Sequence, residues 1–395
     1  MKVLMINTVC GITSTGRICT DIADILTERG DECKVAHGRG VVPEKDKKYS
    51  VKIGNDFDVK VHGLGTRIFD NTGFYSVKAT KDFLKWVEEY DPDIIHLHNI
   101  HGYYINIKLL FEYLKKSGKP IVWTLHDCWA FTGHCAHYTF AGCGKWKTGC
   151  SKCPIKKEYP SSFVIDNSKR NYKIKKDLFG GLKDLYLVTP SEWLKNEVKQ
   201  SFLKEYPVKV FNNGINLETF KPIKNKFRQQ YNLENKFILL GVANIWSKRK
   251  GIDDFINLST VLDKKYQIVL VGDIRDVKLP DNIIHIPHTN NIQELAEIYA
   301  DADVFVNPTY EDNFPTTNLE SLACGTPVIT YKVGGSPEAI DENNGCIVPV
   351  GDINAIVSAI ETLKADSKCC VENAKRFDKE KCFDKYIELY KEILK

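Results

Sequence analysis

Two carboxylates eight residues apart lie in the stretch YEDNFPTTNLESLACGTPVITYKVGGSPE, residues 310–338. Asp312 is in a turn-rich segment, and Glu320 is in a helical pattern that follows it. Carboxylates accept hydrogen bonds from hydroxyl groups. The backbone N–H groups of Phe314 and Thr316 lie at the start of the expected helix, where the helix dipole favours an anion. The stretch therefore predicts a site for a ligand that carries both hydroxyl and phosphate groups.

A cluster of cations follows another apolar run. Lys248, Arg249 and Lys250 come directly before Gly251 and a helical pattern. Three cations suit a polyanion such as a diphosphate, and each charge-assisted hydrogen bond contributes about 1.5–3 kcal/mol. The alternative is a solvated basic turn. The position after a strand favours a ligand, because ligands of parallel sheets bind at the carboxyl ends of the strands.

A third candidate site is the N-terminal loop CGITSTGR, residues 10–17. Gly11 and Gly16 frame a loop that enters a helix, which directs backbone N–H groups toward an anion. The spacing resembles a Walker loop, but Arg17 and Ile18 stand where that motif has Lys and Ser or Thr. The alternative is a helix-entry turn that binds nothing.

Strand-like and helix-like segments alternate along almost the whole chain, which predicts parallel sheets with crossover helices and the α/β fold class. The strand-like runs are KVLMIN, CKVAHG, DIIHLHN, PIVWTLH and DLYLVTP in the first half, and NKFILLGVAN, KKYQIVLVGD, DNIIHIPH, ADVFVNPT and TPVITY in the second. The segment KEYPVKVFNNGIN, residues 204–216, is expected to be a linker or a tight turn between the halves. We expect two doubly wound domains that face each other, with the site in the cleft between them.

Length and composition agree with a globular enzyme or binding protein of two domains. The chain has 395 residues, a net charge of +4 and thirteen cysteines. We expect no signal peptide, because the N-terminus runs directly into a strand-like segment, and no run approaches about 18 apolar residues. The expected location is cytoplasmic, where cysteines are packing residues, metal ligands or reactive thiols rather than disulfides.

The motif with Asp312 and Glu320, followed by LACGTPVI and GGSPE, resembles the E-x7-E segment of retaining family-four glycosyltransferases. Further motifs follow in the family's order, namely STGR, TLHD (124–127), TPSEW (189–193), FNNGIN (211–216) and the RKG that ends at Gly251. EDNFPTTNLESLACGTPVITY and TLHDCWAFTGHC resemble the branch that works on bacterial capsule or colanic-acid-type exopolysaccharide. This resemblance implies the GT-B fold of two facing Rossmann-like domains.

The resemblance also implies the domain roles. Residues 1–206 would form the acceptor-binding domain, and residues 207–376 would bind the nucleotide-sugar donor. The helical tail 377–395 would pack back on the first domain. The expected partners are a UDP- or GDP-sugar and a glycan or polyprenyl-diphosphate-linked acceptor, with no nucleic acid. No cofactor is expected for catalysis, because cations and the helix dipole neutralise the leaving group.

The resemblance carries specific roles to residues of this chain. His126, Asp312 and Lys250 would be catalytic: His126 near the donor sugar, Asp312 at the reacting carbon, and Lys250 on the leaving diphosphate. Glu320 would bind the ribose hydroxyls. The other donor-binding residues would be Gly16, Arg249, Asn313, Phe314 and Thr316.

Two departures from the family pattern keep other functions open. Asp312 is one methylene shorter than the family's Glu, although Glu311 is adjacent, and Asn244 stands where the family has an arginine before RKG. One alternative is a GT-B sugar-nucleotide epimerase, which would share the nucleotide site and need no acceptor. The other is a nucleotide-sugar-binding protein without catalysis.

A cysteine cluster lies in CAHYTFAGCGKWKTGCSKCP. Cys135, Cys143, Cys150 and Cys153 fall within nineteen residues and end in C-x2-C. Four thiolates suit a structural, tetrahedral zinc site with no open position for catalysis. The alternative is four buried free thiols.

The segment around this cluster is basic. Residues 144–177 hold ten Lys or Arg residues against three acidic ones. Trp146, Tyr159, Phe163 and Tyr172 lie among them and could reach an interface. Anionic lipid attracts each nearby cation by about 1 kcal/mol, so the segment suits peripheral contact with the inner face of the membrane. A solvated basic loop is the alternative.

Overall fold

The computed structural model describes residues 1–395, and the chain divides into two compact units. The first comprises residues 1–212 and 383–395, and the second comprises residues 213–382. The first unit extends beyond residue 206 because strand β7 (Val208–Val210) pairs with β6 (Leu185–Thr189). The segment 204–216, expected to be a linker or turn, therefore contains a strand.

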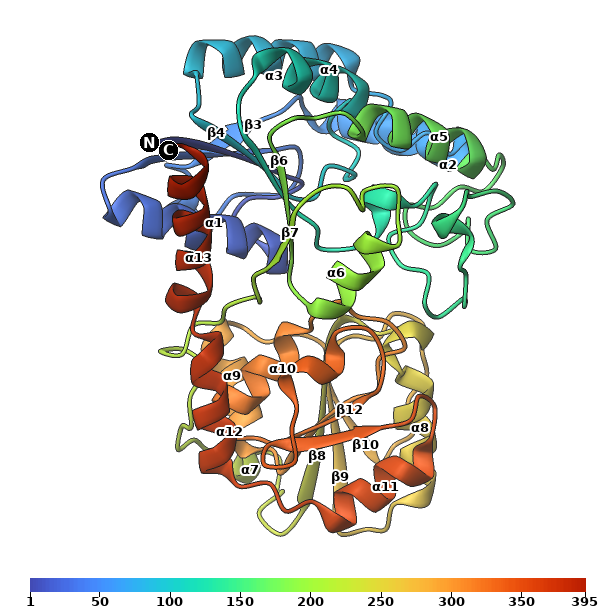
Figure 1. Ribbon diagram of the computed structural model, residues 1–395. Helices are drawn as coiled ribbons and strands as arrows, with labels where there is room; N and C mark the ends of the chain where they lie inside the picture. The colour runs from blue at the N-terminus through green and yellow to red at the C-terminus, as the bar shows by residue number, and fades with distance from the viewer. The chain divides into compact units, whose positions relative to one another are not determined.

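The first unit contains a parallel sheet in the order β3-β2-β1-β4-β5-β6-β7 (Figure 1). The sequence order runs outward in both directions from β1, as in doubly wound folds. Five of the six residues of β1 are buried, because helices cover both faces of the sheet. The strands before β6 are β1 (Lys2–Asn7), β2 (Glu32–His37), β3 (Ser50–Lys52), β4 (Ile94–Leu97) and β5 (Ile121–Thr124).

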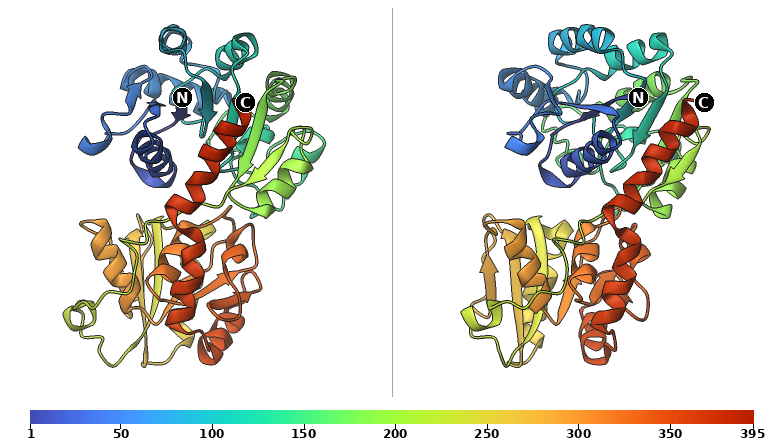
Figure 2. Two further views of the ribbon diagram at one scale, coloured as in Figure 1. Left: turned by 60° about the vertical axis from the view of Figure 1, so that its left-hand side comes forward. Right: turned by 90° about the vertical axis from the view of Figure 1, so that its left-hand side faces the viewer.

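Helices α3 and α4 cover one face of this sheet, where Phe83 and Phe111 share a core with Ile95 of β4. The next residue along β4, His96, points to the opposite face. There its Nδ1 lies 2.6 Å from the hydroxyl of Tyr390 on the C-terminal helix, drawn in red in Figure 2. The helices of the unit are α1 (Thr13–Glu28), α2 (Asp56–Phe69), α3 (Val77–Tyr90), α4 (Ile107–Ser117), α5 (Ser168–Phe179), α6 (Glu192–Lys199) and the part of α13 (Lys379–Ile393) that follows Cys382.

The second unit contains a parallel sheet in the order β10-β9-β8-β11-β12-β13. It is also doubly wound, because the order runs outward from β8 in both directions. The strands are β8 (Phe237–Ile245), β9 (Tyr266–Asp273), β10 (Ile283–Ile286), β11 (Val304–Asn307), β12 (Val328–Tyr331) and β13 (Gly345–Val348).

Alternate residues of β8 face the two cores of this unit. Leu240 packs in one core with Leu322 of α10, whereas Leu239 packs in the other with Phe255 of α8. The helices are α7 (Phe227–Gln230), α8 (Ile252–Val261), α9 (Ile292–Asp301), α10 (Thr316–Ala323), α11 (Ile353–Thr362) and α12 (Ser367–Ala374). No helix of the chain is long and apolar enough to cross a bilayer.

Candidate functional site

The carboxyl edge of the second sheet brings a cation and a carboxylate together. Lys250 lies in the short turn after β8, and Asp312 lies in the loop after β11. β8 and β11 are neighbours in the sheet, so the two loops meet although 62 residues separate them. The Nζ of Lys250 is 2.6 Å from Oδ2 of Asp312, and both side chains are partly exposed. The site therefore has a paired charge that a ligand can still reach.

Arg249 attaches the cationic turn to the same loop. Its Nη1 donates to the carbonyl of Glu311 at 3.3 Å, and its Nε lies 3.7 Å from the carboxylate of that residue. Its own carbonyl accepts the N–H of Tyr310 at 2.9 Å. Arg249 is thus held by the loop, and Lys250 is directed toward Asp312.

Two glycines allow the close approach of these segments. Gly251 has φ +76°, and a Cβ atom there would lie 2.3 Å from the carbonyl oxygen of Pro308. Gly334 has φ +57°, and a Cβ atom there would lie 1.9 Å from the carbonyl oxygen of Asp312. The left-handed conformation and the contact both exclude a side chain. The RKG and GGS motifs therefore shape the loop that carries Asp312.

Helix α10 begins directly behind this loop. Its N-cap is Pro315, which makes no side-chain capping bond, and Thr316 is half-buried in the first turn. Asn313 and Phe314 are buried just before the helix. An uncapped helix N-terminus leaves backbone N–H groups for an anion.

Glu320 lies on α10, one turn after its start, and is buried. Its Oε2 accepts a hydrogen bond from the hydroxyl of Tyr299 at 3.2 Å. The structure thus joins Arg249, Lys250 and the loop of Asp312 by direct contacts and places Glu320 on the helix that follows this loop.

His126 belongs to the first unit, where it follows β5 at the carboxyl edge of that sheet. Its Nε2 lies 2.9 Å from Nδ1 of His98, the residue after β4. Burial lowers the pKa of His126 to about 4, an effect that Asp127 opposes. His126 is therefore a neutral imidazole near neutral pH.

Two further residues near this edge, His101 and Asp127, were not predicted as site residues, and Tyr159 was expected only at an interface. His101 lies 2.8 Å from Oδ2 of Asp127, and its other ring nitrogen lies 3.0 Å from the hydroxyl of Tyr159. Burial raises the pKa of Asp127, but the charge and hydrogen bond of His101 outweigh it and lower the pKa to about 2. The available signal was Asp127 itself, which is adjacent to His126 in TLHD directly after a strand.

Gly16 is not in a loop, as the sequence analysis expected. Helix α1 begins at Thr13, so Gly16 lies in its first turn and is buried. The N–H of Gly11 donates to the carbonyl of Gly16 at 3.1 Å. The turn therefore closes on itself by a backbone hydrogen bond.

The four cysteines Cys135, Cys143, Cys150 and Cys153 line one cavity of about 10 Å³, the size of a single water or ion. A hydrogen bond from Cys135 lowers the pKa of Cys153 to about 7. The N–H of Gly133 donates to Sγ of Cys150 at 3.2 Å. No three His, Cys, Asp or Glu side chains of the chain are grouped as metal ligands, so zinc binding would require the thiols to turn toward the cavity.

The basic segment does not present all of its residues to solvent. Trp146 and Tyr172 are buried, in contrast to the expectation that they reach an interface, whereas Tyr159 and Phe163 are exposed. Lys175 is buried as well, because α5 turns it inward under Trp129. Trp146 packs against Phe131 and Tyr138. It therefore contributes to packing within the loop and does not reach an interface.

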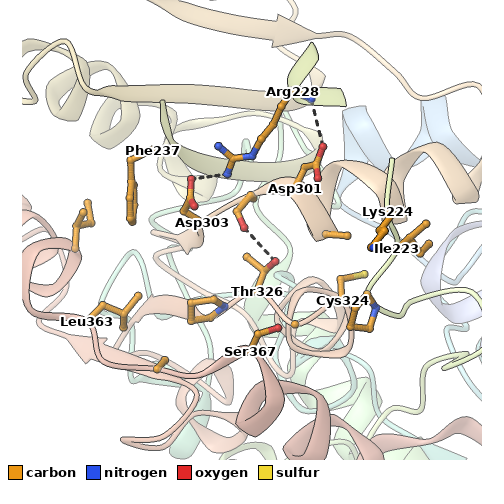
Figure 3. Close-up of a pocket in the computed structure, with 17 residues that line it drawn as sticks. Ile223, Lys224, Arg228, Phe237, Asp301, Asp303, Cys324, Thr326, Leu363 and Ser367 are labelled. Atoms are coloured by element: carbon orange, nitrogen blue, oxygen red, sulfur yellow. Dashed lines mark hydrogen bonds and ion pairs between the residues drawn. The ribbon is translucent and has the colours of Figure 1, made fainter. Parts of the chain in front are cut away.

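A separate hollow lies elsewhere in the second unit (Figure 3). It measures about 680 Å³ and is lined by Phe237, Asp303 and Pro327, which begin or precede β8, β11 and β12. It is therefore at the amino ends of the strands, opposite to the edge that carries Lys250. Arg228 and Asp303 form an ion pair of 2.7 Å inside it. This cation is therefore already paired with a carboxylate of the protein, and the hollow is not the candidate site.

The sequences of two known families match the chain. The pattern described as Glycosyltransferase Family 4 matches residues 15–219, and the pattern described as Glycosyl transferases group 1 matches residues 236–366. The second match contains the loop of Asp312 and helix α10.

Two relatives have related names. The chain is 26% identical over 276 residues to WcaC of Escherichia coli K12, named as a colanic acid biosynthesis glycosyl transferase. It is 28% identical over 217 residues to an N,N'-diacetylbacillosaminyl-diphospho-undecaprenol alpha-1,3-N-acetylgalactosaminyltransferase of Campylobacter jejuni. The matches cover 67% and 49% of this chain, and they span 66% and 56% of the two relatives.

Solved structures confirm the expected fold. Sucrose-phosphate synthase from Thermosynechococcus elongatus superimposes with a TM-score of 0.75 at 16% identity, covering 99% of this chain and 98% of the other. HepE of Anabaena in complex with UDP gives a TM-score of 0.67 at 16% identity, covering 99% and 100%. The prediction of two Rossmann-like domains of the GT-B class was correct.

Proposed function

Because the chain belongs to glycosyltransferase family 4, we propose that it transfers a sugar from a nucleotide-diphospho-sugar to an acceptor hydroxyl and retains the anomeric configuration. We place this activity in bacterial surface polysaccharide synthesis, since the Escherichia coli relative is named for colanic acid. The contact between Lys250 and Asp312 carries the proposal. It puts a cation and a carboxylate at the sheet edge where parallel folds bind ligands.

The second unit, residues 213–382, is the proposed donor-binding domain. Lys250 and Arg249 neutralise the diphosphate of a UDP- or GDP-sugar, together with the N–H groups at the start of α10 near Asn313, Phe314 and Thr316. Glu320 accepts hydrogen bonds from the ribose. Its position on α10, the helix that follows the loop of Asp312, supports this role.

The proposed chemistry uses no side-chain nucleophile. The bond from the anomeric carbon to the diphosphate breaks as the acceptor oxygen attacks from the same face. The departing phosphate oxygen takes the acceptor proton. Lys250 stabilises the negative charge that develops on the diphosphate, Asp312 the positive charge on the sugar, and neutral His126 donates a hydrogen bond to the sugar. This step needs no metal, since the cations of the chain neutralise the leaving group.

The first unit is the proposed acceptor-binding domain, with Gly16 near the phosphates. We propose a polyprenyl-diphosphate-linked acceptor, because the Campylobacter jejuni relative is named for a diphospho-undecaprenol substrate. One surface supports it. The exposed face of α2 carries Phe57, Val61 and Leu64. We name this face, together with the exposed residues 163–165, the α2 surface.

Two backbone hydrogen bonds hold the halves of the α2 surface together. The N–H of Phe163 donates to the carbonyl of Arg67 at 2.8 Å, and the N–H of Ile165 donates to that of Ile68 at 3.1 Å. Exposed cations surround it, namely Lys60, Arg67, Lys169, Arg170 and Lys173. Apolar side chains beside cations suit the surface of an anionic membrane. We therefore propose that the protein is cytoplasmic and binds the inner face of the membrane peripherally.

We also propose that Cys135, Cys143, Cys150 and Cys153 bind a structural zinc ion. Four thiolates would complete its tetrahedral coordination and leave no position for a substrate. The shared cavity supports this proposal, and the metal content of the purified protein tests it. A zinc-to-protein ratio near zero would exclude it.

Calorimetric titration with UDP, GDP, dTDP and CDP tests the donor site. We expect tight binding of one nucleotide by the wild type and loss of binding in Glu320→Ala. If no nucleotide binds at millimolar concentration, the proposed function is wrong. The stereochemistry of the product then separates a retaining transferase from a sugar-nucleotide epimerase, and the absence of any turnover would indicate a binding protein.

A further inference from the structure

His98 is a buried neighbour of the proposed catalytic histidine, His126. It directly follows β4, and its Nδ1 lies 2.9 Å from Nε2 of His126, which comes after the adjacent strand β5. The two rings are stacked, with 5.2 Å between their centres and 12° between their planes. His98 is 1% exposed, whereas His126 is only half-buried. His98 therefore contacts one ring nitrogen of His126 from inside the protein.

The sheet holds His98 in place. Its N–H donates to the carbonyl of Ile6 at 2.9 Å, and its carbonyl accepts the indole N–H of Trp123 at 3.1 Å. The ring of His96, two residues earlier on the same face of the sheet, lies 4.0 Å from that of His98. Hydrogen bonds at both ring nitrogens fix His96 in turn. The position of the His98 ring is therefore set by its surroundings and not by His126 alone.

The proton between the two rings can belong to either histidine. Burial lowers the pKa of both, so both are neutral near neutral pH, and each has one N–H and one acceptor nitrogen. The Nε2 of His98 is buried and has no hydrogen-bond partner in the protein. If His126 donated, His98 would carry its own proton on this Nε2, as a buried N–H without an acceptor. Among backbone groups such orphaned donors are rarer than under-satisfied acceptors, so the arrangement favours donation by His98.

We infer that His98 is a positioning residue, which donates from Nδ1 to Nε2 of His126 and thereby keeps the proton of His126 on Nδ1. This inference rests on the proposed function, in which neutral His126 donates a hydrogen bond to the donor sugar. A neutral histidine that accepts at Nε2 can donate only from Nδ1. The contact with His98 therefore assigns the bond to the sugar to one nitrogen of His126.

The tautomer is measured by NMR on the full-length protein with ¹⁵N-labelled histidine, because long-range ¹H–¹⁵N correlations distinguish an Nδ1–H ring from an Nε2–H ring. The signals that disappear in His126→Asn identify His126. We expect the Nδ1–H form for His126 in the wild type, and the Nε2–H form would overturn the inference. The measurement needs no substrate, so it stays decisive even if the protein transfers no sugar and the proposed function fails.

Transferase kinetics test the positioning role. His98→Phe removes the ring nitrogens, His98→Asn keeps an amide group at the place of Nδ1, and His98→Gln carries its amide one bond further out. We expect kcat to fall about tenfold in His98→Phe, the value of one hydrogen bond made in the transition state, with little change in KM for the donor. His98→Asn should restore most of kcat, and more than His98→Gln does.

The matched control is His62→Phe. His62 is a fully buried histidine of α2 with hydrogen bonds at both ring nitrogens, so its replacement matches the loss of a buried imidazole and should leave kcat unchanged. A wild-type kcat in His98→Phe would overturn the positioning role. Equal losses in His98→Asn and His98→Gln would do the same, and this comparison applies even if His98→Phe does not fold.

Discussion

The ammonium group of Lys250 lies 2.6 Å from the carboxylate of Asp312 at the carboxyl edge of the second sheet. The two groups neutralise each other, so the ligand-free site carries little net charge at this point. In the proposed function, an arriving diphosphate would compete with Asp312 for Lys250. The proposed donor therefore binds by exchanging one partner of the lysine for another, and the carboxylate is released toward the sugar.

Replacing Lys250 by Met should lower kcat/KM for the donor about 10- to 100-fold, because one charge-assisted hydrogen bond contributes about 1.5–3 kcal/mol. The measurement is the initial rate at varied donor concentration. Lys265 forms a comparable surface pair with Asp263 at 3.5 Å, so Lys265→Met is the matched control and should keep the wild-type rate. Equal rates for Lys250→Met and the wild type would show that Lys250 does not contact the diphosphate.

Sequence patterns predicted the parallel sheets and put Lys250 and Asp312 in loops that follow strands. The sequence did not predict that these two strands, β8 and β11, are neighbours, and only the sheet order brings their loops together. The ion pair itself was not predicted, because it depends on the close approach that Gly251 permits. The inward turn of Lys175 was also missed. A lysine in a basic segment is expected in solvent, and only the fold shows that α5 buries it.

Replacing Glu320 by Gln should weaken binding of the preferred nucleotide about 10- to 100-fold, since a charged acceptor for the ribose hydroxyls is lost. The 2′-deoxy nucleotide provides the sharper measurement. Wild type should discriminate against it in calorimetric titration, and Glu320→Gln should discriminate much less. The exposed Glu361→Gln is the control. If both proteins discriminate equally, Glu320 does not bind this hydroxyl.

Replacing Gly251 by Ala should destabilise the protein more than the same change at Gly118. Both glycines have a left-handed φ, +76° and +62°, so both variants incur backbone strain of about 1–2 kcal/mol. A Cβ atom at Gly118 has no neighbour within 4 Å, whereas one at Gly251 would meet Pro308 at 2.3 Å. Thermal melting measures the loss of stability of each variant. Only Gly251→Ala should also bind the donor more weakly than the wild type. Equal melting temperatures for Gly251→Ala and Gly118→Ala would contradict the close approach of Gly251 to Pro308.

The double variant Val61→Ser and Leu64→Ser should bind vesicles with anionic lipid about 30-fold more weakly than the wild type, because each exposed apolar side chain contributes about 1 kcal/mol on insertion. Cosedimentation at low salt measures the bound fraction. Val261 in the second unit is 57% exposed, so Val261→Ser controls for loss of an exposed apolar side chain. Retention of the double variant on vesicles would exclude the α2 surface as the membrane contact.

Acid should destabilise the first unit through His126. Burial lowers its pKa to about 4 in the folded protein, whereas an unfolded histidine titrates near pH 6.5. Between these values the unfolded chain binds the additional proton, so stability falls as the pH decreases through this window. His126 contributes about 2 kcal/mol of this loss between pH 7 and pH 5.

Urea unfolding at the two pH values measures the effect, and His126→Asn should show a smaller loss than the wild type. The exposed His288→Asn is the control. The same low pKa keeps His126 neutral for its proposed hydrogen bond to the donor sugar. Any loss of transferase activity between pH 7 and pH 5.5 should therefore be the same in the wild type and in His126→Asn. A His126-dependent inflection near pH 6.5 would indicate a charged imidazole and would contradict this role.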